Sequence, residues 1–294
     1  MQDRRNKPIL VCGARGKQGG AIARELLAAG WKVRAMTRYP ESDGARALAA
    51  LGAEVVQADL NDEASLRRVL SGAWGTVAVQ NTWEAGVALE EEQGHRFARV
   101  AKDVGVQHLV YQSVASAHRA TGIPHFDNKA RIEDTVRSLE FASHVIIRPV
   151  FFMENLLGPF FKPYIDQGNF AIGLPPETRL QMIAVADIGK YGLAAFERAE
   201  ELNRREIDIA GDELTPSQTA EVLSDVTDRG IKFYQVPIED VRKASEDYAI
   251  MLEWFDAVGY NADIEATSAE FGIKPTRFRE WAAKQTWEVA AEVA

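Results

Sequence analysis

The chain has 294 residues and a formal net charge of −9, with 46% hydrophobic and 26% charged residues. These proportions are ordinary for a globular protein of one or two domains, and the length provides a core that needs no disulfide staples. The negative charge argues against direct binding to nucleic acid, which depends on a basic surface.

The single cysteine, Cys12, falls in the first predicted strand. It indicates a buried thiol in a reducing compartment and excludes an intramolecular disulfide framework. The polar residues 1–7 lack the apolar core of a signal peptide, and no apolar run approaches the ~20 residues that span a bilayer. The five histidines are scattered, so no metal site is expected. We therefore predict a cytoplasmic protein that binds neither membrane nor metal.

Short apolar runs alternate with helical patterning over the first half of the chain. This rhythm predicts a Rossmann-type α/β fold, with a doubly wound parallel sheet and helices on both faces. The predicted strands cover residues 9–12, 31–36, 54–57, 75–80, 108–112 and 145–147. The predicted helices include residues 42–51, a helix through Leu70 capped by Asn61 or Asp62, 84–104 and 125–139.

The alternation of strand and helix patterns is less regular after Pro149, where a short segment is rich in aromatic residues and prolines. This segment is interpreted either as a pocket wall or as interdomain core. Further on, a helix is predicted over 185–199, a strand over 206–210, a helix from Pro216 to about 226 behind a Thr215 cap, a strand over 232–236 and a helical tail from 239. Residues 1–155, with about 184–230 returning to them, are predicted to form one domain around the parallel sheet. Residues from about 156–183 and 231–294 are predicted to form a smaller, discontinuous C-terminal α/β cap domain for a substrate or partner.

Three glycines, Gly13, Gly16 and Gly19, join the first predicted strand to a helix. Their spacing differs from the standard G-x-G-x-x-G, and a glycine triplet alone also fits a flexible loop. The strand before it and the helix and second strand after it favour a βαβ unit that binds a dinucleotide. The backbone N–H groups at the start of that helix, around Lys17 and Gln18, then face the pyrophosphate.

The end of the second strand carries no carboxylate to hold a ribose 2′-hydroxyl. Instead, Arg38 can grip a 2′-phosphate with its guanidinium fork, and Thr37 can donate one hydrogen bond. Arg15 in the glycine loop could reach the same phosphate. The alternative is that both arginines are ordinary surface residues. We predict that the domain formed by residues 1–155 and about 184–230 binds NADP(H) rather than NAD(H).

Further candidates follow other predicted strands, at the carboxyl edge where open α/β sheets bind ligands. Asp59, followed by Leu60, could accept a hydrogen bond from the adenine amino group or could serve only as a turn residue. Gln80, Asn81 and Thr82 are candidates for contacts to the ribose or the pyrophosphate.

The order of these motifs resembles that of the extended and atypical short-chain dehydrogenase/reductase superfamily, and within it the NmrA-like family. The stretches GARGKQGG, TRYP, IPHFDNK and RPVFFMENLL carry the resemblance, which covers most of the chain. In that superfamily a Tyr four residues before a Lys acts in carbonyl reduction, and a Ser about a dozen residues earlier polarises the substrate carbonyl. Here Ser113 and Lys129 match, but His125 occupies the tyrosine position.

The resemblance therefore implies Ser113, His125 and Lys129 as candidate catalytic residues, with Lys129 also a ribose ligand. It also implies that Phe152 lies against the nicotinamide ring and that Asn155 lines the site, although core packing explains those two equally well. His125 could donate a proton near neutral pH or could only shape the pocket.

Two functions follow from the resemblance, since the family contains both kinds of protein. The first is a redox-sensing regulator that binds NADP(H) and acts through protein partners. The second is an NADPH-dependent oxidoreductase that reduces quinones or other conjugated acceptors by direct hydride transfer. A structural domain without cofactor is disfavoured by the intact glycine loop and Arg38. The substrate and the oligomeric state are not decided by the sequence.

Overall fold

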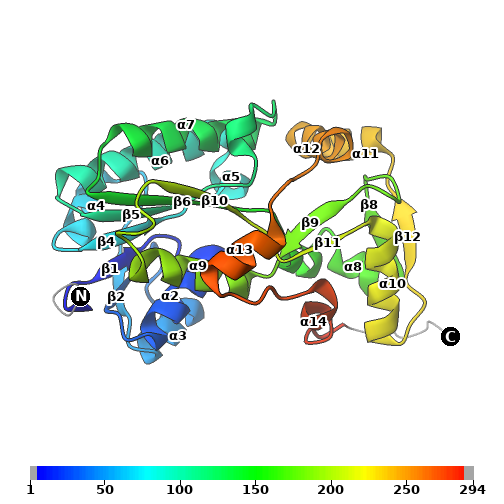
Figure 1. The fold of residues 1–294 in the computed structure, drawn as a ribbon, viewed down its shortest axis with the longest axis horizontal. Helices are drawn as coiled ribbons and strands as arrows, with labels where there is room; N and C mark the ends of the chain where they lie inside the picture. Colours follow the sequence, from blue (N-terminus) through cyan, green and yellow to red (C-terminus); the bar gives the residue numbers. More distant parts are fainter. Residues whose placement is uncertain (1–4, 288–294) are drawn as a thin grey trace. The chain divides into compact units, whose positions relative to one another are not determined.

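A computed structural model describes residues 5–287, which divide into two compact units (Figure 1). The first unit contains the chain up to Ala120, Pro124–Arg148 and Ile188–Asp208. The second contains Thr121–Ile123, Pro149–Asp187 and the chain from Ile209. Because the chain crosses between the units several times, neither unit is one continuous segment.

The first unit is built around a seven-stranded sheet of order β10-β6-β5-β4-β1-β2-β3. Strand β1 pairs in parallel with both β2 and β4, and β2–β3, β4–β5 and β5–β6 are also parallel. The strand order reverses between β1 and β4, which confirms the predicted doubly wound sheet. The strands are β1 (Ile9–Val11), β2 (Val33–Thr37), β3 (Glu54–Gln57), β4 (Gly75–Ala78), β5 (His108–Gln112), β6 (Ser143–Pro149) and β10 (Arg205–Ile209).

Helices cover both faces of this sheet (Figure 1). One face carries α4 (Glu63–Leu70), α6 (Val87–Asp103) and α7 (Pro124–Ser138), and the other carries α2 (Lys17–Ala28), α3 (Asp43–Ala50) and α9 (Val185–Glu197). Apolar side chains of α4, α6 and α7 form a buried cluster with β1, β4 and β5 that includes Leu10, Phe97 and Leu109. A short 3-10 turn, η1 (Ala117–Arg119), precedes α7.

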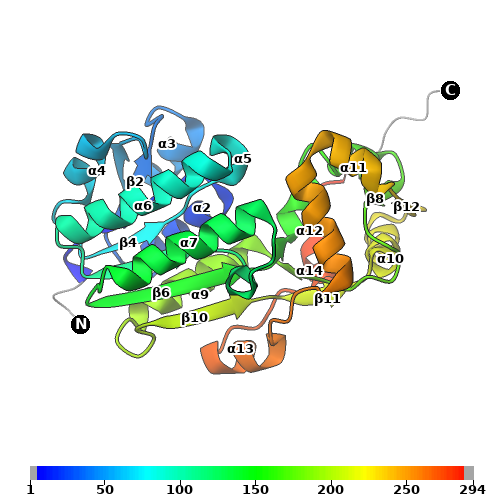
Figure 2. The ribbon, with the colours of Figure 1, turned by 90° about the horizontal axis from the view of Figure 1, so that it is seen from above.

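The predicted helix over 84–104 is wrong in its first turn. A separate short helix, α5 (Thr82–Ala85), precedes α6, and the two are divided at Gly86, whose φ of +80° takes the backbone out of the helical region. Helix α5 follows the carboxyl end of β4 (Figure 2), so the break creates a distinct element at the candidate site.

Local capping signals were predicted correctly. Asp62, not Asn61, caps α4 by accepting hydrogen bonds from the N–H groups of Ala64 and Ser65. Thr215 and Gln218 form a capping box at the start of α10 (Pro216–Thr227).

The second unit contains a three-stranded sheet of order β11-β9-β7 and a two-stranded sheet of order β12-β8. Four of these strands were not predicted from the sequence: β7 (Phe151–Phe152), β8 (Asn169–Ile172), β9 (Leu180–Ile183) and β11 (Asp212–Leu214). The remaining elements are β12 (Lys232–Gln235), η2 (Met153–Leu157), α8 (Lys162–Asp166), α10, α11 (Ile238–Ala244), α12 (Glu246–Ala257), α13 (Ile264–Phe271) and α14 (Phe278–Ala282).

Helix α10 contacts α14, β8 and β12 and therefore belongs to the second unit, whereas the sequence placed the chain to about residue 230 in the first. Phe161 packs against both Phe151 and Phe170 in the interior of the second unit, with ring centroids 6.2 Å apart in each of these two pairs. Phe160 and Tyr164 are exposed. The roles of the two units, cofactor binding and cap, stay a prediction.

Candidate functional site

The glycine turn between β1 and α2 is shaped by backbone contacts that only glycine allows. Gly13 has a φ of +62°, and a Cβ on Gly19 would lie 2.5 Å from the Gly13 carbonyl oxygen. Gly16 is the N-cap residue of α2 and makes no side-chain cap hydrogen bond. The turn is exposed at Gly13, Arg15 and Gly16. A helix N-terminus without a side-chain cap, behind an exposed turn, is a suitable anion-binding site.

Two arginines meet over one aromatic ring next to this turn. The guanidinium carbon of Arg15 lies 5.1 Å from the centroid of the Tyr39 ring, and that of Arg38 lies 5.4 Å from it. The Tyr39 side chain is 57% exposed. Arg38 also forms an ion pair with Glu84 of α5. The hydroxyl of Thr37, at the end of β2, accepts a hydrogen bond from the Tyr39 N–H at 3.0 Å. The tertiary structure thus gathers the two predicted phosphate ligands at one corner.

The carboxyl ends of β4 and β5 carry buried polar groups that have no protein partner within residues 5–287. Gln80, Gln112 and Ser113 are each at most 5% exposed, yet the amide atoms of both glutamines and the Ser113 hydroxyl form no hydrogen bond there. The side-chain oxygen of Gln18, in the first turn of α2, is in the same condition. Buried polar groups normally find partners, so these four fit a site completed by a polar ligand such as a dinucleotide.

Two other candidates have local structural roles. Asp59 accepts a hydrogen bond from the Asn61 N–H at 2.8 Å, and the side-chain oxygen of Asn81 accepts from the Trp83 N–H at the start of α5. Leu60 is half-buried against the core cluster, and its carbonyl accepts from Arg96. These contacts favour the turn function for Asp59, the alternative that the sequence left open.

Lys129 lies on α7 and forms an ion pair with Glu90 of α6 at 2.5 Å. Glu90 is fully buried and also accepts hydrogen bonds from the Thr82 hydroxyl and the Asn128 amide. A run of three glutamates, residues 90–92, is typical of a solvated helix face, but Glu90 is fully buried. Glu90 lies three, four and seven residues before the buried Gln93, Gly94 and Phe97, which places all four on one face of the helix. That spacing could have predicted the burial of Glu90.

Burial opposes ionisation of Glu90, but the charge of Lys129 and the three hydrogen bonds outweigh that cost and lower the pKa of the carboxyl group. Glu90 therefore stays ionised and holds the Lys129 ammonium group in place. An ammonium group has three N–H donors, so this ion pair leaves donors for a ribose. Lys129 is thus paired with a carboxylate, and the position four residues before it holds His125 and not a tyrosine.

His125, at the expected tyrosine position, is buried in the first turn of α7. Its ring packs edge-on against Phe126, with centroids 4.8 Å apart, and is tilted against the exposed Trp83 at 5.1 Å. Tyr111 does not replace the missing tyrosine, because burial and the charges of Glu90 and Glu133 raise the pKa of its hydroxyl well above the usual value. The site therefore contains an imidazole where relatives in the superfamily carry a phenol.

Phe152 and Asn155 belong to the second unit, in β7 and η2. Both are half-buried, and their contact with a cofactor stays a prediction. Between them, Glu154 accepts hydrogen bonds from the Val185 N–H and the Trp281 indole, each at 3.0 Å. This part of the family motif thus holds segments of the second unit together.

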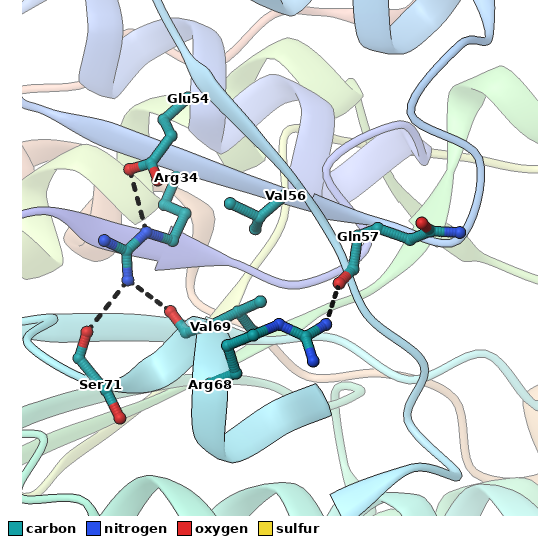
Figure 3. A pocket seen from close by; sticks show the side chains of 7 residues that line it. All are labelled: Arg34, Glu54, Val56, Gln57, Arg68, Val69 and Ser71. Carbon is teal, nitrogen blue, oxygen red and sulfur yellow. Dashed lines mark hydrogen bonds and ion pairs between the residues drawn. The ribbon is translucent and has the colours of Figure 1, made fainter. Parts of the chain in front are cut away.

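A separate pocket opens between β2, β3 and the end of α4 (Figure 3). Arg34 donates to Glu54 and to the carbonyls of Val69 and Ser71, and Arg68 donates to the carbonyl of Gln57. This pocket is lined by none of the predicted phosphate ligands Arg15, Thr37 and Arg38, so it is not the predicted phosphate site.

Two further searches cover the described part of the chain. Residues 5–287 contain no group of three or more His, Cys, Asp or Glu side chains that could hold a metal ion. Among the helices of the same residues, none combines the length and the apolar character needed to cross a bilayer.

Two similar curated proteins are both described as containing an NmrA-like family domain. An NmrA-like family domain-containing protein of Dictyostelium discoideum is 26% identical over 303 residues, covering 97% of this chain and 99% of the relative. The NmrA-like family domain-containing oxidoreductase himF of Aspergillus japonicus is 35% identical over 160 residues, covering 51% of this chain and 48% of himF. The match thus spans about half the length of himF.

Solved structures share the fold at low sequence identity. NmrA, a negative transcriptional regulator in complex with NADP, matches with a TM-score of 0.76 and 21% identity over 95% of this chain and 94% of NmrA. The NADPH-dependent quinone oxidoreductase QOR2 of Escherichia coli, complexed with NADPH, matches with a TM-score of 0.78 and 22% identity over 94% of this chain and 98% of QOR2.

These likenesses confirm the Rossmann-type fold class. The family model described as the NmrA-like family matches residues 5–282, nearly the full chain. The protein therefore belongs to the NmrA-like family, as its motifs predicted.

Proposed function

We propose that the first unit binds NADP(H) and that the protein is an NADPH-dependent oxidoreductase acting on quinones or other conjugated aromatic acceptors. The observation that carries the cofactor choice is the pair of guanidinium groups, Arg15 and Arg38, placed over Tyr39 beside the glycine turn. A 2′-phosphate is the part of NADP(H) that two such groups recognise and that NAD(H) lacks.

The remaining residues fit the rest of the dinucleotide. The uncapped start of α2 suits the pyrophosphate, and the unpartnered Gln80, Gln112 and Ser113 suit polar groups of a ligand along the carboxyl edge. Lys129, held by Glu90, would bind the hydroxyls of the nicotinamide ribose.

When bound, NADPH supplies a hydride to the acceptor and leaves as NADP⁺. The acceptor, having gained two electrons and one hydrogen, takes one proton to become the hydroquinone. His125, four residues before Lys129 on the same helix, would donate that proton, and solvent would replace it afterwards. A conjugated acceptor suits this site because its reduced anion is delocalised and needs less help from a protein acid than an aldehyde does.

A second function is favoured by one observation. The ammonium group of Lys129 is neutralised by a buried carboxylate, and the usual tyrosine is replaced by His125, so the site lacks the acid–base pair of ordinary carbonyl reduction. A redox-sensing regulator needs only to bind NADP(H) and pass its state to a protein partner. NmrA itself is a negative transcriptional regulator crystallised with NADP. A cytoplasmic location, with its supply of NADPH, is part of both proposals.

The deciding experiment measures NADPH consumption with a panel of quinones, aldehydes and imines. The expected result is turnover of quinones well above background, lowered by Lys129→Ala and by His125→Ala. Tight NADPH binding without turnover of any acceptor would support the regulator. Titration with NADPH and NADH tests the cofactor separately, since Arg38→Ala should weaken NADPH at least about tenfold and leave NADH unchanged. Equal loss for both dinucleotides would refute the assignment of Arg38.

A further inference from the structure

Arg38 already has a protein partner, with which a bound cofactor would have to compete for its guanidinium group. Its Nη2 forms an ion pair with the Glu84 carboxylate, and the two side chains are 43% and 53% exposed. Glu84 lies on α5, 46 residues along the chain from Arg38, so no local signal in the sequence joins them. The charge of Glu84 and its hydrogen bond raise the pKa of Arg38 despite partial desolvation, which shows that the carboxylate acts on the guanidinium group.

Helix α5 fixes where this carboxylate can go. Asn81 caps its start, and the Thr82 hydroxyl is bound to the buried Glu90. Its end is set by Gly86, where the chain leaves the helical region. Because these contacts anchor the start of α5, Glu84 is presented to Arg38 from a hydrogen-bonded helical turn.

Resting on the proposed NADP(H) site, we propose that Glu84 is a specificity-determining residue that competes with the 2′-phosphate for Arg38. A carboxylate and a phosphate both accept hydrogen bonds from the same guanidinium N–H groups. NADP(H) must therefore displace Glu84 before Arg38 can bind the phosphate. NAD(H) carries a hydroxyl in place of the 2′-phosphate and leaves the ion pair intact. Glu84 therefore weakens the binding of NADP(H) alone and makes the protein less selective for NADP(H) over NAD(H).

The competition predicts that NADPH binds more tightly when the negative charge of Glu84 is removed. Glu84→Gln keeps the size and polarity of the side chain and removes its charge. It should tighten binding of NADPH by about 1.5- to fivefold, the range of an exposed ion pair, and leave NADH unchanged. Adenosine 2′,5′-bisphosphate should tighten equally, and 5′-AMP should not, since the effect belongs to the 2′-phosphate alone.

The experiment is a titration of these four ligands against the whole chain and its variants. Glu54→Gln is the matched control, because Glu54 pairs with Arg34 at the opposite end of β2 and is similarly exposed at 59%. This control should leave every affinity unchanged. In Arg38→Ala, the further change Glu84→Gln should have no effect on NADPH, because the shared group is gone.

The outcomes separate this inference from the function on which it rests. If Arg38→Ala weakens NADPH binding but Glu84→Gln does not tighten it, the competition is refuted while the NADP(H) site stands. A weaker affinity in Glu84→Gln would show instead that Glu84 orients Arg38. If neither dinucleotide binds the unaltered protein, or Arg38→Ala has no effect, the proposed function fails and the competition fails with it.

Discussion

The ammonium nitrogen of Lys129 lies 2.5 Å from the carboxylate of Glu90, which is fully buried between α6 and α7. This ion pair links the lysine of the family motif to a residue 39 positions away in the chain. It gives the lysine a fixed place without a tyrosine beside it. Its removal should affect both the stability of the first unit and the proposed ribose contact.

Glu90→Gln should lower the free energy of unfolding by about 3 kcal/mol, because it leaves the Lys129 charge without its partner in a largely buried place. Urea denaturation followed by circular dichroism measures this change. Glu92→Gln is the control, since Glu92 is exposed on the same helix, and its effect should stay within about 0.5 kcal/mol. Equal stability of the two variants would show that the ion pair contributes nothing.

The same pair predicts a pH dependence. The pKa of Glu90 is lowered from its ordinary value of 4.5, so ionised Glu90 contributes stability that is present above that value. This contribution is lost as the pH falls from 4.5 through the lowered pKa, because over that range the unfolded chain binds more protons than the folded chain does. The stability difference between the unaltered protein and Glu90→Gln should therefore be constant near neutral pH and shrink in acid. A difference that grows in acid would contradict the assigned ion pair.

Gly19→Ala should destabilise the protein by about 1–3 kcal/mol and abolish dinucleotide binding. The added Cβ would lie 2.5 Å from the Gly13 carbonyl oxygen, so the turn must open and α2 must shift. Thermal unfolding and titration with NADPH provide the two measurements. Gly230→Ala is the control, because no atom lies within 4 Å of a Cβ there, and unchanged NADPH affinity in Gly19→Ala would argue against this turn as the binding site.

Cys12 should resist alkylation in the folded protein. Burial raises the pKa of its thiol to about 12, and its Sγ donates to the Val79 carbonyl at 3.2 Å. Only the thiolate reacts with iodoacetamide, so mass spectrometry should find no adduct near neutral pH until the chain is unfolded in denaturant. Rapid modification of the native protein would place Cys12 at an exposed site, contrary to its position after β1.

The sequence by itself determined the features that depend on near neighbours in the chain. Apolar runs of strand length, the glycine turn and the caps at Asp62 and Thr215 each act within a few residues, so composition and spacing were enough to predict them. The doubly wound order follows from the same alternation, because crossover connections have one handedness. The short strands β7, β8, β9 and β11 escaped prediction because their pairing partners, and not their own patterns, make them strands.

Only the tertiary structure decided which charges meet. Arg38 was visible as a candidate for the 2′-phosphate, but its ion pair with Glu84 and its shared place with Arg15 over Tyr39 depend on how the sheet brings β2 beside the segments that follow β1 and β4. Glu90 looked like part of a solvated acidic run until α7 was packed against α6 and Lys129 reached it. Contacts between residues about forty positions apart are set by the packing of whole elements, which no local pattern encodes.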